Sequence, residues 1–157
     1  MSTIKNEDFT NALLAVLGET FEKVEGYYLD KNTSLFETLA TVTAEQASLP
    51  VGGQCATLAA QVKHTAFYLD VVAEFVKNPN TPKPDWSEIW RTVNVVSAAE
   101  WQAIQDELRS SYHNTQALIR STPEWPSADE IGGAIGLLAH SAYHLGEIRQ
   151  ALCTLSA

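Results

Sequence analysis

Six prolines divide this chain into long segments in which apolar residues recur at the spacing of an α-helix. They are Pro50, Pro79, Pro82, Pro84, Pro123 and Pro126. Proline lacks a backbone donor and clashes with the preceding turn, so it marks the ends of helices rather than their interiors. No segment shows the strict alternation of apolar and polar residues that is typical of a half-buried strand. The chain is therefore predicted to be all-α.

The apolar spacing predicts four long helices, over residues 6–21, 54–77, 98–121 and 128–155. A serine or threonine followed three residues later by glutamate or glutamine can form a capping box at a helix start. Such boxes begin at Ser34, Thr43, Ser97 and Ser127. The first two predict a short helix over residues 35–42 and one further turn before Pro50. A loop is predicted at residues 51–53. A proline-rich crossover is predicted at residues 78–85, and a short helical turn follows it over residues 86–91.

Two helices have well-defined apolar faces that are predicted to point into a core. On the second long helix this face comprises Leu58, Val62, Thr65, Leu69, Val72 and Val76. On the third it comprises Trp101, Ile104, Leu108, Tyr112, Thr115 and Ile119. Four long helices with one long crossover predict a four-helix bundle. Since 157 residues suffice for one core and composition does not shift along the chain, residues 1–157 are predicted to form a single domain.

The charge balance argues against several classes of partner. Nineteen acidic and ten basic residues give a net charge of −9, which repels phosphate backbones and anionic membranes. The longest uncharged stretch, residues 131–146, is shorter than the roughly 20 apolar residues of a membrane span. Cys55 and Cys153 form no CxxC motif, and the first residues resemble no signal peptide. We therefore expect a cytoplasmic protein that contacts neither nucleic acid nor membrane.

Two histidines on the last helix have the spacing of half a metal site. His140 and His144 are four residues apart, which places their rings one turn apart on one helix face. A zincin protease would need glutamate directly after the first histidine, but Ser141 stands there. Residues 131–146 carry no charge, so this helix is predicted to be the most buried of the four. Buried imidazoles need partners, which a metal ion would provide, although the pair alone also fits core histidines.

His64 is the candidate third ligand. It shares a helix face with Tyr68, Val71 and Phe75, so it is predicted to point inward or along a seam between helices. A lone inward histidine is more often a core residue than a ligand, but this helix could face the one with the pair. Three histidines would leave open coordination positions, as in reactive rather than structural sites. His113 shares its helix face with charged residues and is given no functional role.

Three stretches of the chain stand out: His140-Ser-Ala-Tyr-His-Leu-Gly-Glu-Ile-Arg-Gln150, Gln61-Val-Lys-His-Thr-Ala-Phe-Tyr-Leu69, and Trp86-Ser-Glu-Ile-Trp90 followed by Glu100-Trp101. Together they resemble the DinB-like (DinB/YfiT-type) metal-binding four-helix-bundle family. The resemblance extends from about residue 7 to 155. It implies an up-down-down-up bundle, a homodimer, and a divalent metal held by His64, His140 and His144. Nickel or zinc is expected, with iron or manganese as alternatives.

The same resemblance implies a reaction class. Characterised relatives include thiol-dependent S-transferases and a mycothiol-dependent maleylpyruvate isomerase, in which the metal is thought to activate a low-molecular-weight thiol. The chain departs from the family at Glu147, where many members have glutamine. That carboxylate could support a ligand, act as a base or pair with Arg149 on the surface, and the surface pair is the default interpretation. Tyr68, Trp90 and Tyr143 are candidates to line a cofactor pocket beside the metal, although spaced aromatic residues more often pack in a core.

Three functional hypotheses follow for this chain. The first is a metal-dependent enzyme of the thiol S-transferase type, or one with a hydrolase-like activity, that acts on a small-molecule ligand. The second is a non-catalytic metal-binding protein, such as a stress-response protein of this damage-inducible family. The third is a structural dimeric bundle whose histidines are core residues.

Overall fold

The computed structural model describes residues 4–50, 55–78 and 80–155, and within them every regular element is a helix. The all-α class is therefore confirmed. In chain order the helices are α1 (Asn6–Phe21), α2 (Leu35–Leu39), α3 (Ala44–Ala47), α4 (Leu58–Lys77), α5 (Glu88–Thr92), α6 (Ala98–Ser121) and α7 (Ala128–Leu155). The loop predicted at residues 51–53 lies outside the described residues.

The helix boundaries follow the capping residues of the sequence. Capping boxes are present at Ser34, Thr43 and Ser97, where α2, α3 and α6 begin. Two predicted boundaries are wrong. Helix α4 begins at Leu58 rather than near residue 54, because the Thr57 hydroxyl accepts a hydrogen bond from the Ala60 amide at 3.2 Å and caps the helix there. Helix α2 ends at Leu39, three residues before its predicted end.

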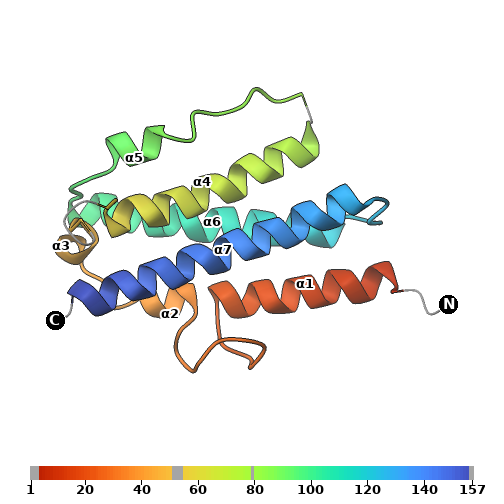
Figure 1. Ribbon diagram of the computed structural model, residues 1–157, viewed down its shortest axis with the longest axis horizontal. Coiled ribbons are helices and arrows are strands. Elements are labelled where there is room, and N and C mark those ends of the chain that lie inside the picture. The colour runs from red at the N-terminus through yellow and green to blue at the C-terminus, as the bar shows by residue number, and fades with distance from the viewer. Residues whose placement is uncertain (1–3, 51–54, 79, 156–157) are drawn as a thin grey trace.

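The four long helices lie side by side, and the segment that contains α5 runs along the outside of α4 (Figure 1). Helix α4 packs against α6 and α7, and α1 packs against the other sides of α6 and α7. Each long helix contributes a fully buried aliphatic side chain to one core: Leu17, Leu69, Leu108 and Ile148. Burying such a side chain stabilises the fold by roughly 1.5–3 kcal/mol before entropy is counted. This packing holds α4 and α7 against each other.

The distribution of burial corrects two sequence predictions. Helix α7 is not the most buried helix: it exposes Ile135 (51%) and Tyr143 (61%), whereas buried side chains occur throughout most of α4. On α4, Val76 is 58% exposed although it belongs to the predicted apolar face. Helix α7 packs mainly against α4 and α1, and its exposed residues lie away from the core. Its apolar composition therefore does not translate into burial.

Polar contacts join α4 to α6. Lys63 forms an ion pair with Glu107, and the Ser111 hydroxyl donates a hydrogen bond to Asp70 at 2.9 Å. These side chains lie at the α4–α6 seam because this seam is only half-buried and accepts charged side chains. None of the helices in the described part of the chain is long and apolar enough to cross a bilayer.

A buried carboxylate organises the turn after α1. Glu19 accepts four backbone hydrogen bonds of 2.6–2.8 Å, from the amides of Glu25, Tyr27, Tyr28 and Leu29. Burial alone would raise the pKa of this carboxyl, but the four donors favour its charged form and bring its pKa to about 2. The carboxylate therefore fixes the path of the chain between α1 and α2.

Candidate metal centre

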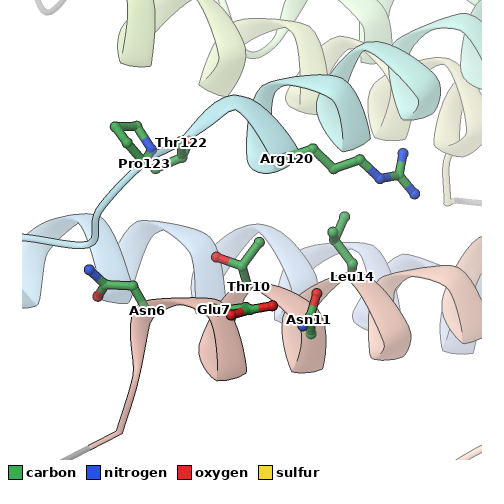
Figure 2. Close-up of a pocket in the computed structure, with 8 residues that line it drawn as sticks. All are labelled: Asn6, Glu7, Thr10, Asn11, Leu14, Arg120, Thr122 and Pro123. Carbon is green, nitrogen blue, oxygen red and sulfur yellow. The ribbon is translucent and has the colours of Figure 1, made fainter.

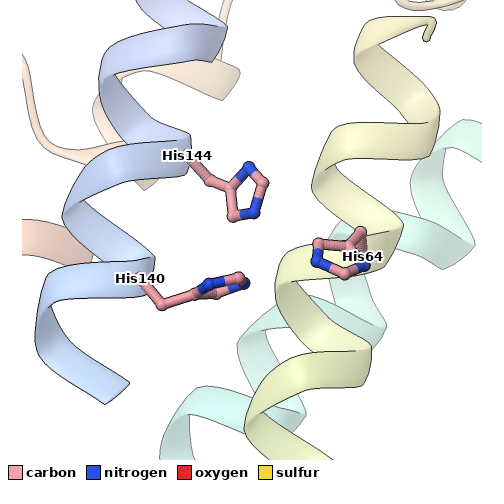
Figure 3. Close-up of side chains that lie close together, drawn as sticks. All are labelled: His64, His140 and His144. Atoms are coloured by element: carbon pink, nitrogen blue, oxygen red, sulfur yellow. The ribbon is translucent and has the colours of Figure 1, made fainter. Parts of the chain in front are cut away.

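Three histidine rings converge where α4 faces α7 (Figure 3). His64 comes from α4, and His140 and His144 come from adjacent turns of α7. The ring centroid of His64 lies 5.3 Å from that of His140 and 5.0 Å from that of His144, and the two α7 rings are 4.4 Å apart. One nitrogen atom from each ring lies within 4.8 Å of the others. The packing of α4 against α7 thus joins the predicted pair to the predicted third residue.

Burial keeps the three rings neutral. His64 is 7% exposed, His144 is 5% exposed, and His140 is half-buried. Burial lowers the pKa of His64 and of His140 to about 4, and in both cases the neighbouring His144 lowers it further. Burial also lowers the pKa of His144, against an opposing effect of Glu147. At neutral pH each ring therefore offers a lone pair rather than a positive charge.

The donor set fits a divalent metal ion. A buried nitrogen without a hydrogen-bond partner remains on two of the rings, Nδ1 of His64 and Nε2 of His140, whereas Nδ1 of His144 lies 2.9 Å from Glu147 Oε2. Unpartnered buried polar atoms are costly and uncommon in native proteins. Neutral imidazole is a common ligand of zinc, nickel, copper and ferrous iron. These three histidines can therefore hold a metal ion, with coordination positions left for a further ligand.

Aromatic side chains surround the histidines. The Tyr68 ring stacks on His140 with centroids 3.6 Å apart, and the Trp90 ring lies 4.5 Å from His64. Trp86 contacts the Tyr68 ring at 6.0 Å and the His64 ring at 6.5 Å, and it is 39% exposed. Trp86 and Trp90, which follow the crossover, therefore lie over the histidines. Tyr68 and Trp90 lie beside the histidines, as the sequence predicted.

Glu147 and Tyr143 form a polar contact with His144. The Tyr143 hydroxyl donates a hydrogen bond to Glu147 Oε1 at 2.6 Å, and Glu147 Oε2 lies 2.9 Å from His144 Nδ1. This second contact is at hydrogen-bond distance. The default interpretation of Glu147 as a surface charge paired with Arg149 is wrong, because its carboxylate contacts Tyr143 and His144 instead.

Sequence reasoning missed one polar residue on α4. Gln61 is 9% exposed, and its side-chain oxygen is buried without a hydrogen-bond partner. It precedes His64 by three residues, which is one turn on the same side of the helix. The available signal was that Gln61 is a polar residue within an otherwise apolar run at the start of α4.

Other candidates lie outside this cluster. His113 is exposed on α6, as expected, and Cys55 and Cys153 are exposed free thiols. A hollow of about 390 Å³ lies between α1 and the end of α6, with Leu14 and Arg120 on its two sides (Figure 2). No described residue of α4 or α7 lines it, so it is separate from the metal centre.

Comparisons with protein-family models, with curated proteins and with solved structures find no match.

Proposed function

We propose that this chain binds one divalent metal ion through His64, His140 and His144. The observation that supports this most directly is the convergence of three neutral, buried rings whose ligand atoms lie within 4.8 Å of one another. Histidines that served only as core residues would find hydrogen-bond partners in the protein, but His64 and His140 each have a buried nitrogen without one. Nickel and zinc are the proposed ions, because the resemblance to the DinB-like family implies them and both suit a site of neutral imidazoles.

We further propose that the chain is a DinB-like protein with an up-down-down-up bundle. The resemblance at residues 61–69, 86–90 and 140–150 supports the family. The direction of the chain in Figure 1 supports the topology, because α1 and α7 run one way and α4 and α6 run the other way. A homodimer is part of this proposal and rests on the same resemblance. A cytoplasmic location is proposed as well, because Cys55 and Cys153 are free thiols.

The proposed activity is transfer of a low-molecular-weight thiol to an electrophile. A bound divalent ion would supply electrostatic stabilisation of a thiolate and lower the pKa of the thiol. The protein residues have separate tasks. Tyr68 and Trp90 shield the site from water on the side of the crossover, and the aromatic surface offers apolar contact to an electrophile. The three donors leave room for an exogenous ligand, which a closed four-ligand site would not.

One observation favours the alternative of a non-catalytic metal-binding protein. Arg91 on α5 and Arg149 on α7 are the basic residues of these two helices that could bind an anionic thiol. The Arg91 guanidinium contacts Asp85 Oδ2 at 2.6 Å, and it also donates to the Ser87 hydroxyl. The cation on α5 is thus already paired. A stress-response role in metal binding without turnover remains the second candidate function for this reason.

Elemental analysis of untagged protein tests the metal proposal. We expect about one nickel or zinc ion per chain in the wild type and loss of that ion in His144→Ala. His113→Ala is the matched control, because it removes an exposed imidazole from α6 and should retain the metal. Absence of metal in the wild type after incubation with nickel and with zinc would overturn the proposal. Turnover of thiol and electrophile pairs by the loaded protein then separates the enzyme from the non-catalytic alternative.

A further inference from the structure

A carboxylate links the candidate metal centre to an exposed tyrosine. On α7, Tyr143, His144 and Glu147 lie at positions i, i+1 and i+4, so one helical turn brings Glu147 next to both other side chains. The two oxygens of the carboxylate have different partners. Oε1 accepts from the Tyr143 hydroxyl at 2.6 Å, and Oε2 lies 2.9 Å from His144 Nδ1.

The two nitrogens of His144 therefore face different surroundings. Figure 3 shows one ring nitrogen turned toward the other two histidines and the second turned away from them. Since Nδ1 is next to Glu147, the nitrogen that faces the other rings is Nε2. A neutral imidazole has one N–H and one lone pair. A carboxylate beside Nδ1 favours the tautomer with hydrogen on Nδ1, which leaves the Nε2 lone pair free for a metal.

We propose that Glu147 is a positioning residue of the metal centre, which fixes the tautomer and the ring orientation of His144. This inference rests on the proposed metal binding. Metal-ligating histidines commonly donate their second N–H to a carboxylate or carbonyl, and this contact raises the basicity of the ligating nitrogen. Tyr143 assists by holding the carboxylate, since its hydroxyl occupies the other oxygen. Glu147 is 34% exposed on its side chain, so the tyrosine contact restricts a group that would otherwise sample solvent.

The position of the carboxylate also distinguishes this role from direct metal ligation. Its nearer oxygen contacts the ring nitrogen that is turned away from the other histidines. The three-residue cluster whose ligand atoms lie close together comprises only histidines among the described residues. Glu147 therefore acts through His144.

The test combines a tautomer measurement on metal-free protein with zinc affinity. Long-range ¹H–¹⁵N spectra of the imidazoles report which nitrogen of His144 is protonated, without any metal present. We expect the Nδ1–H form in the wild type and a shift toward the Nε2–H form in Glu147→Ala. Zinc affinity should fall about 10- to 100-fold in Glu147→Ala. Glu147→Gln should retain the tautomer and most of the affinity, because its amide oxygen still accepts from Nδ1–H.

Two further variants complete the experiment. Tyr143→Phe leaves the carboxylate in place, so its zinc affinity should lie between those of the wild type and Glu147→Ala. Glu74→Ala is the charge-matched control, because Glu74 is an exposed α4 residue whose partner is Lys77 at 2.9 Å. It should bind zinc like the wild type.

Several results would overturn the inference. Unchanged zinc affinity or an unchanged His144 tautomer in Glu147→Ala would show that the carboxylate does not position the ring. Equal losses of affinity in Glu147→Gln and Glu147→Ala would show that Glu147 is itself a ligand. If the wild type binds no zinc, the proposed metal function fails, and the tautomer measurement still decides whether Glu147 orients His144.

Discussion

Replacement of His64 by leucine is expected to change the stability of the protein in opposite directions with and without metal. In the metal-free protein, His64 places a ring in the interior with Nδ1 unpartnered. An unsatisfied buried polar group costs about 1–3 kcal/mol. Leucine removes that cost, whereas the loss of the ring contact with Trp90 at 4.5 Å offsets part of the gain. The free energy of unfolding of metal-free His64→Leu should therefore equal that of the wild type or exceed it by up to about 2 kcal/mol.

When metal is added, the wild type is expected to be more stable than His64→Leu. A ligand that binds only the folded state stabilises it by about 2.7 kcal/mol at a free concentration of 100 times Kd. Unfolding entropy is about 2.1 cal/mol/K per residue, or roughly 0.33 kcal/mol/K for the 157 residues of this chain. The corresponding rise in Tm is about 8 °C for the wild type. His64→Leu keeps only two of the three ligands, so its rise should be much smaller.

Thermal unfolding followed by circular dichroism, in chelator and in excess zinc, checks both halves of this prediction. His113→Leu is the matched control, because His113 is exposed and should show the wild-type response in both conditions. Equal zinc-induced shifts in the wild type and His64→Leu would refute the assignment of His64 as a ligand. A loss of several kcal/mol in metal-free His64→Leu would instead show that the ring has a structural role in the core.

Two other properties can be measured directly. In metal-free protein the free energy of unfolding should fall as pH is lowered from about 6.5 toward 4. The reason is that His64 and His140 have a pKa near 4 when folded against 6.5 when unfolded, so the unfolded chain binds more protons in that window. Urea titrations across this range check the slope, and a slope identical in His64→Leu would contradict its cause. Trp101→Phe should lower the free energy of unfolding by about 1–3 kcal/mol, because the buried Val42 carbonyl loses the indole N–H that donates to it at 2.8 Å. Urea unfolding at pH 7 measures the loss, and a change under about 0.5 kcal/mol would mean that another donor replaces the indole.

Local signals in the sequence were sufficient for most of the helices. Helix α1 has its predicted bounds, and α6 extends from the capping residue Ser97 to Ser121. Capping residues and prolines act over three or four positions, so their effect is visible in one stretch of sequence. At the start of α4 the apolar spacing predicted a helix from residue 54, but Thr57 caps the helix and it begins at Leu58.

Burial and side-chain contacts between helices were less predictable. The uncharged composition of α7 predicted the most buried helix, yet Ile135 and Tyr143 are exposed. The composition of a helix shows how much apolar surface it could bury. Only the part of that surface that packs against another helix is buried. The same limit explains Glu147, because its partner depends on which face of α7 meets α4 and how the His144 ring is turned.

The all-α class, most helix starts and the His140–His144 pair could be predicted from the sequence, since helical periodicity, caps and an i,i+4 spacing are local properties of the chain. Only the tertiary structure decided that His64 joins this pair, that Trp90 lies against its ring and that Glu147 faces His144. His64 and His140 are far apart in sequence, and the packing of α4 against α7 brings them within 5.3 Å. Such a contact depends on the relative placement of whole helices, which no short stretch of sequence encodes.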